Sequence, residues 1–168
     1  MLSTVSRLRL FALSAGAVAA LATTSYAQSP ERVQVVLGEH IGGVRIGMTL
    51  PMVRQLVGSL RLAPLQTPRS LTWIAGPLTI RVARSGHVDQ VRVSIHTLPR
   101  GTSLVVNNQL LMARTRLSQL APRYPSCTNT EDPTDHHALV VCTGPSGVTR
   151  FEQGPDHVGL LVLTLSAR

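Results

Sequence analysis

Apolar and polar residues alternate along two stretches near the middle of the chain. The alternation runs from Leu78 to Val82 and again from Val91 to Ile95. Because successive side chains of a β-strand point to opposite faces of its sheet, this spacing predicts strands with one apolar face and one polar, basic face. Turn residues at Gly76-Pro77 and Ser85-Gly86 separate these segments. The pattern therefore predicts three antiparallel strands, at about 70–75, 78–83 and 88–96.

A different spacing precedes these strands. Leu50, Val53 and Val57 recur at intervals of three and four residues, which is typical of the apolar stripe of a short amphipathic helix. Thr49 is a suitable N-cap for such a helix, and Gly58 is a suitable residue to end it. We therefore expect a short helix that packs its apolar stripe on the strands that follow.

This pattern recurs about 67 residues further along the chain. The segment from Gly76 to Gly86 and the segment from Gly144 to Gly154 both read Gly-Pro, eight residues, Gly. Leu117, Leu120 and Tyr124 repeat the helical spacing, behind a possible N-cap at Thr115, and strands are expected at about 138–142, 148–152 and 158–166. We therefore predict an α+β fold of two tandem repeats, each a short helix followed by a three-stranded antiparallel sheet.

The N-terminal segment predicts the compartment. Arg7 and Arg9 precede a run of 13 apolar or small residues from Leu10 to Ala22, and Ser25-Tyr26-Ala27 forms a small-residue junction. This order is typical of a cleavable signal peptide, and the run is shorter than the roughly 20 residues of a membrane-spanning helix. We expect residues 1–27 to be the signal, 28–98 the first repeat, 99–109 a polar linker and 110–168 the second repeat.

The two cysteines fit this prediction of a periplasmic or secreted protein. Cys127 and Cys142 are the only cysteines of the chain, and they flank a polar loop. In an oxidising compartment such a pair is expected to form a disulfide. Because Cys127 follows the second predicted helix, the bridge is expected to join that helix to the sheet.

Net charge points to the kind of partner. Past residue 27 the chain has 14 arginines, 8 acidic residues and no lysine, for a net charge of +6. A basic protein outside the cytoplasm meets anionic lipids, lipopolysaccharide and acidic proteins far more often than nucleic acid. We therefore expect an envelope or extracellular protein, or an anionic envelope component, as the partner, with no nucleic acid and no membrane span after signal removal.

Catalytic motifs are lacking. The sequence contains neither G-x-S-x-G nor S-x-x-K, and His87 and His157 stand near Asp89 and Asp156, where surface ion pairs are expected. Gly42-Gly43 lacks the lysine that a phosphate-binding loop requires, so a tight turn is the better interpretation. The sequence predicts a protein that is not an enzyme and needs no cofactor.

The loop between the cysteines offers an alternative. It contains five possible metal ligands: Glu131, Asp132, Asp135, His136 and His137. The favoured interpretation is a solvated acidic loop without a metal, because adjacent histidines reach one ion only with a suitable turn. The alternative is a small metal-binding protein or metal-dependent hydrolase centred on this loop.

One segment resembles known families. VRIGMTLPMVRQLVG, Val44 to Gly58, resembles the I-x-x-GMT-x-x-x-V-x-x-L-x-G helix opening of the small outer-membrane lipoprotein of the β-barrel assembly machinery. The doubled helix-plus-sheet unit with a cysteine pair is similar to the secreted tandem-repeat β-lactamase inhibitor proteins. Both resemblances imply a unit that binds proteins without chemistry. This chain departs from them in lacking a lipid-bearing cysteine and a disulfide in the first repeat.

Four residues are the candidates for partner binding. Arg81, Arg92 and His96 are expected on one strand face, with Trp73 beside them. Arginine and tryptophan are among the residues that most often anchor binding surfaces. The alternative is that Trp73 packs in the core and that the arginines only form a solvated surface. We predict a non-enzymatic exported binding module whose basic sheet face contacts a protein or an anionic envelope component. A purely structural role in the envelope is a third possibility.

Overall fold

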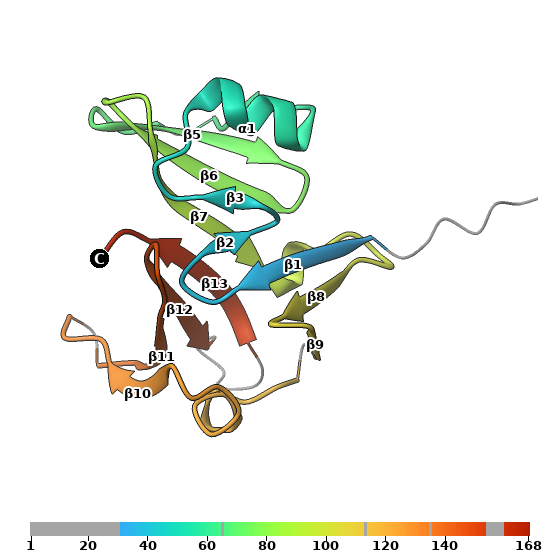
Figure 1. The fold of residues 1–168 in the computed structure, drawn as a ribbon, viewed down its shortest axis with the longest axis vertical. Coiled ribbons are helices and arrows are strands. Elements are labelled where there is room, and N and C mark those ends of the chain that lie inside the picture. Colours follow the sequence, from blue (N-terminus) through green and yellow to red (C-terminus); the bar gives the residue numbers. More distant parts are fainter. Residues whose placement is uncertain (1–30, 65, 113, 135, 154–159) are drawn as a thin grey trace, which may run out of the picture.

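The chain folds into two β-sheets packed around one core (Figure 1). The computed structural model describes residues 31–168 except 65, 113, 135 and 154–159, so the predicted signal peptide lies outside the described residues. None of the helices in this described part is long and apolar enough to span a membrane.

The larger sheet consists of two antiparallel meanders of four strands each. Its strand order is β10-β11-β12-β13-β7-β6-β5-β4, so the meanders meet where β13 pairs with β7 and Thr164 lies opposite Arg92. The first meander comprises β4 (Arg61–Leu62), β5 (Ser70–Ala75), β6 (Leu78–Ala83) and β7 (Val88–Ser94). The second comprises β10 (Cys127–Glu131), β11 (Ala138–Thr143), β12 (Val148–Gln153) and β13 (Leu160–Ser166).

The smaller sheet brings together two segments that are far apart in the sequence. β1 (Arg32–Val36) pairs in parallel with β8 (Ser103–Val106) at its centre. Asn107 and Asn108 both have positive φ, 44° and 65°, as a tight two-residue hairpin turn requires. The remaining strands are β2 (His40–Ile41), β3 (Val44–Arg45) and β9 (Gln109–Leu111).

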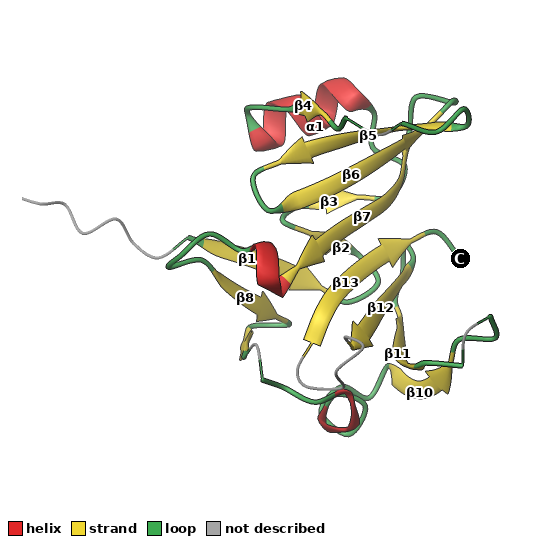
Figure 2. Cartoon of the chain, turned by 180° about the vertical axis from the view of Figure 1, so that it is seen from behind, coloured by secondary structure: helices red, strands yellow, loops and turns green. Residues whose placement is uncertain are grey.

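The core lies between the sheets. β2 and β3 lie against β7, and the two views agree that the smaller sheet covers one face of the larger one (Figures 1 and 2). Ile80, Val91 and Leu163 from the larger sheet are buried with Ile41 and Val44 from the smaller one. These contacts confirm the predicted alternation on β6 and β7, with apolar residues inward and polar residues outward.

The smaller sheet is fastened to the second meander by two turns in close contact. The Gly38 N–H donates to Thr149 Oγ1 at 2.8 Å, and the Ser146 N–H donates to the Gly38 carbonyl at 3.0 Å. Gly38 has φ +65°, and a Cβ atom there would lie 2.2 Å from the Gly144 nitrogen. The contact therefore requires glycine at position 38, for both its φ and its lack of a side chain.

Helix α1 (Leu50–Val57) lies over the first meander, where the sequence predicts it. Val53 is completely buried, and Gly58 ends the helix with φ +71°. Thr49 occupies the N-cap position, but its side chain makes no capping hydrogen bond. A 3₁₀ helix, η1 (Ile95–Thr97), follows β7, so this strand ends before the predicted residue 96.

The second predicted helix is wrong. Past Thr115 the chain forms only a three-residue 3₁₀ helix, η2 (Leu117–Gln119). Pro122 and Pro125 leave too few residues for a stable α-helix, because proline disfavours helical backbone at the residue before it. The apolar stripe is nevertheless buried, since Leu117, Leu120 and Tyr124 all belong to the core.

The predicted α+β fold of two helix-plus-sheet repeats is therefore wrong. α1 is the only α-helix among the described residues, and the chain is mainly β. The strands of both predicted units lie close to their expected positions. The departures are the missing second helix and a whole second sheet, to which the segment 99–109 contributes β8.

The predicted disulfide is confirmed. Cys127 and Cys142 are bonded and lie directly opposite each other on β10 and β11, with 4.0 Å between their Cα atoms. The bridge thus joins two strands of one hairpin, and not a helix to a strand as expected. It is compatible with an exported protein, because such bridges persist in oxidising compartments.

Candidate binding site

The face of the larger sheet that points away from the core carries four arginines, Arg61, Arg81, Arg92 and Arg150; we call it the outer face. Arg61 on β4 shares this face with Arg92 because Arg61 lies opposite Ile74, Ile74 opposite Thr79 and Thr79 opposite Arg92. Arg92 on β7 lies opposite Thr164 on β13, and Thr164 lies opposite Arg150 on β12. Arg92 and Arg150 thus flank one strand, at a backbone spacing of roughly 10 Å for two strand separations. Arg81 on β6 lies opposite Gln90 of β7. The strand register alone brings these cations onto one surface.

Arg81, Arg92 and Arg150 differ in how far they are neutralised. Arg81 Nε is 2.7 Å from Asp89 Oδ1 in a well-formed ion pair, whereas Arg92 Nη2 is 4.0 Å from Glu152 Oε2. Arg150 is exposed and has no ion pair with any of the described residues. Partly exposed pairs are weak, so Arg92 and Arg150 keep most of their capacity to bind an anion.

The centre of the outer face is closed to solvent. Val162 and Thr164, which point to this face from β13, are 7% and 4% exposed, and Leu139 is buried as well. Arg92 and Arg150 therefore stand on either side of a largely buried strand. The outer face is not a uniformly charged plane.

The predicted site residues fall into two groups. Arg81 and Arg92 share the outer face, and His96 is exposed in η1, beyond the end of β7. Trp73 lies on the core side, since its direct partner on β6 is the buried Ile80. The guanidinium of Arg54 from α1 lies over the Trp73 ring, 5.5 Å from its centroid. The structure thus separates the tryptophan from the arginines that it was expected to accompany.

Arg61 and Arg150 are the arginines of this face that sequence reasoning missed, and Arg61 lies on β4, a strand that was not predicted. Arg150 alternates with Thr149 and Phe151 in a strand that was predicted, so its outward direction was available from the spacing. Its closeness to Arg92 was not, because that depends on the pairing of β13 with β7. No local signal determines which strands of two separate meanders become neighbours.

Charge is also divided unevenly along the chain. Residues 41–130 contain eleven arginines and one acidic residue, Asp89, whereas five of the eight acidic residues lie between Glu131 and Asp156. The described members of the acidic group lie in the second meander and the β10–β11 connection. Six of the eleven arginines lie in α1 and the first meander, where Asp89 is the only acidic residue, and these six make one end of the molecule cationic: Arg54, Arg61, Arg69, Arg81, Arg84 and Arg92.

The acidic loop does not assemble a metal site among the described residues. No group of three histidine, cysteine or acidic side chains comes together there to hold an ion. His136 Nδ1 is 3.4 Å from Glu131 Oε1, which makes an exposed ion pair when the histidine is protonated. Asp135, another predicted ligand, lies outside the described residues.

One histidine of the smaller sheet has a shifted pKa. Burial lowers the pKa of His40, an effect that the Glu39 carboxylate opposes and Arg45 reinforces. The Gly43 N–H donates to His40 Nδ1 at 3.3 Å, which requires that nitrogen to be unprotonated. His40 therefore stabilises the β2–β3 turn as a neutral side chain.

These features define a mainly β, disulfide-bonded domain of two packed sheets with a cationic end. No protein-family model, no curated protein and no solved structure matches the chain. The resemblances of Val44 to Gly58 and of the repeated unit therefore stay predictions. Function has to be argued from the surfaces described above.

Proposed function

We propose that this protein is an exported, non-enzymatic binding module that contacts an anionic envelope component through Arg92 and Arg150. The observation that supports this best is their placement. Two exposed guanidinium groups flank one buried strand of the outer face, and Arg150 has no carboxylate partner among the described residues.

Arginine is suited to this role chemically. Its planar guanidinium forms paired hydrogen bonds with phosphate or carboxylate, and these are among the strongest hydrogen bonds that proteins make. A backbone spacing of roughly 10 Å suits two groups on an extended anionic surface better than one small ion. The arginine excess of residues 41–130 adds long-range attraction to such a surface.

Binding to lipid vesicles tests the proposal. The double variant Arg92→Gln/Arg150→Gln should bind phosphatidylglycerol vesicles at least tenfold more weakly than wild type, because each arginine near an anionic surface contributes about 1 kcal/mol. Wild-type binding should weaken as salt rises and be absent on phosphatidylcholine vesicles. Arg81 is left unchanged because Asp89 already neutralises it.

The matched control removes the same charge elsewhere. Arg100 and Arg114 are exposed, precede β8 and follow β9, and make no ion pair among the described residues. Arg100→Gln/Arg114→Gln should bind nearly as well as wild type. Equal losses in the two double variants would mean that net charge alone drives binding and that the outer face is not the site.

A further inference from the structure

An apolar hollow lies at the cationic end of the molecule, on the core side of the first meander. Its volume is about 430 Å³, within the range of small-molecule sites. It is lined mainly by Leu50, Leu71, Trp73, Val82, Ala83 and Arg84. Leu71 is 46% exposed, so part of this apolar lining is open to solvent. We call this the Trp73 hollow.

Trp73 forms the aromatic wall of the hollow. The ring is held under Arg54 of α1. The indole Nε1 is buried and has no hydrogen-bond acceptor among the described residues, so it is not the atom that a ligand in the hollow would contact. An apolar chain in the hollow would therefore pack against a ring that is already positioned.

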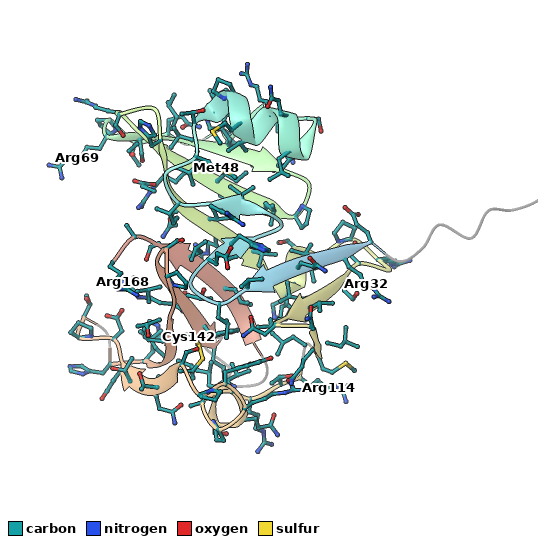
Figure 3. All side chains as sticks on the ribbon, viewed as in Figure 1. Arg32, Met48, Arg69, Arg114, Cys142 and Arg168 are labelled. Atoms are coloured by element: carbon teal, nitrogen blue, oxygen red, sulfur yellow. A yellow bond between two sulfur atoms is a disulfide. The ribbon has the colours of Figure 1, made fainter. Side chains whose placement is uncertain are left out.

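One arginine lines the hollow. Arg84 donates from Nε to the Pro68 carbonyl at 2.7 Å, which leaves its terminal nitrogens for other acceptors. Arg69, from the same 67–70 segment, lines a different depression together with Arg81 and Asp89 of the outer face, and it projects from the far end of the lobe that carries α1 (Figure 3). The only acidic residue of positions 41–130, Asp89, is paired with Arg81.

We infer that the Trp73 hollow binds the alkyl chain of an anionic amphiphile whose carboxylate or phosphate head pairs with Arg84. The aliphatic and aromatic lining suits a flexible apolar chain, and the arginine at its rim selects a negative head group. This site lies on the opposite side of the sheet from Arg92 and Arg150, so the inference does not rest on the proposed function.

The chain carries its own reporter for the test. Trp73 is the only tryptophan, so its fluorescence reports on the hollow without labelling. The purified, disulfide-bonded protein is titrated with dodecanoate and with dodecyl phosphate, each below its micelle concentration, and with dodecyltrimethylammonium as a cation of equal chain length. We expect saturable changes with both anions, and binding of the cation at least tenfold weaker.

Variants locate the contacts. Arg84→Gln should weaken binding of both anions about fivefold, and Leu71→Asn should weaken it by a similar factor. Leu71→Asn keeps the test valid if Arg84→Gln disturbs the loop, because Leu71 lies on β5 and takes no part in the bond between Arg84 and the Pro68 carbonyl. Arg100→Gln, which removes the same charge far from the hollow, should leave the affinity unchanged.

Three results would overturn the inference: non-saturable fluorescence changes, equal affinity for the cationic and anionic amphiphiles, or equal losses in Arg100→Gln and Arg84→Gln. Inorganic phosphate that binds as tightly as dodecyl phosphate would show that the apolar lining contributes nothing. Each of these outcomes leaves the vesicle test of Arg92 and Arg150 unaffected, so the two proposals fail separately.

Discussion

The two meanders of the larger sheet have the same strand arrangement, but different structural elements cover their core faces. The first is covered by α1, whose Val53 is completely buried and whose Arg54 lies over Trp73. The second is covered by the η2 segment with Leu120 and Tyr124, and a disulfide links two of its strands. A four-stranded meander thus needs a cover for its apolar face, but that cover need not be a helix.

The meanders also differ at their outer edges. In the first, Gln66 closes the edge of β5 by accepting from the Thr72 N–H at 2.7 Å and donating to the Thr72 carbonyl at 3.2 Å. In the second, β10 pairs only with β11 among the described strands, and its residues after Cys127 are exposed and polar. Each edge is protected against unwanted pairing, one by a side chain and the other by polar composition.

The largest effect is expected where the second meander meets the smaller sheet. Gly38→Ala places a Cβ atom 2.2 Å from the Gly144 nitrogen at φ +65° and should lower the free energy of unfolding by about 4 kcal/mol or more. Chemical denaturation measures this loss. Gly86→Ala, with φ +82° and no atom near its Cβ, should cost only about 1 kcal/mol. Equal losses would show that the turn contact does not hold the sheets together.

Removing the disulfide should weaken the second meander selectively. Cys127→Ala/Cys142→Ala opens a loop closed by a sequence separation of 15 residues and should lower the free energy of unfolding by about 3 kcal/mol. Hydrogen exchange should accelerate in β10 and β11 before β5 and β6. Uniform acceleration in both meanders would contradict the view that each is covered independently.

The reciprocal change weakens the first meander. Val53→Ala removes two buried methyl groups between α1 and the sheet and should lower the free energy of unfolding by about 2 kcal/mol. Exchange should accelerate mainly in β5 and β6. Met52→Ala on the exposed side of the same helix should cost less than about 0.5 kcal/mol, so comparable losses would refute the packing described for α1.

The smallest predicted effect is a pH dependence at the smaller sheet. Because burial lowers the pKa of His40 in the folded protein, the unfolded chain binds the proton more readily below the usual histidine pKa of about 6.5. Stability should therefore fall as pH falls below this value. The measurement compares denaturation midpoints at pH 7.5 and pH 5.5. The decrease in stability between these two pH values should be smaller in His40→Gln than in wild type. An unchanged or larger fall would assign the pH dependence to other groups.

Local patterns predicted much of the larger sheet. Five of its strands lie close to their expected positions: β5, β6, β7, β11 and β12. The signals that predict them, which are the alternation of apolar and polar residues and the Gly-Pro or Ser-Gly turns, lie within each segment itself. The face of Trp73 was also available, since Trp73 is two residues from Leu71 and from the buried Ala75 and so shares their face. Trp73 was expected beside the arginines because tryptophan and arginine are common in binding surfaces. The strand spacing, which places Trp73 on the opposite face, is the better guide.

The smaller sheet was missed for two different reasons. Asn107-Asn108 between Leu104–Val106 and Gln109–Leu111 is a hairpin signal, but the polar composition of 99–109 favours a linker and masks it. The parallel pairing of β1 with β8 could not be found in this way, since it joins strands about 70 residues apart. The pairing that places Arg92 near Arg150 was hidden for the same reason.

The central claim, that Arg92 and Arg150 form the contact surface, depends most directly on the charge at position 150. Binding to phosphatidylglycerol vesicles should fall in order from wild type to Arg150→Gln to Arg150→Glu, while Arg100→Gln and Arg100→Glu, which change the net charge by the same amounts, should bind alike and close to wild type. If the two series weaken in parallel, the outer face is not the binding surface.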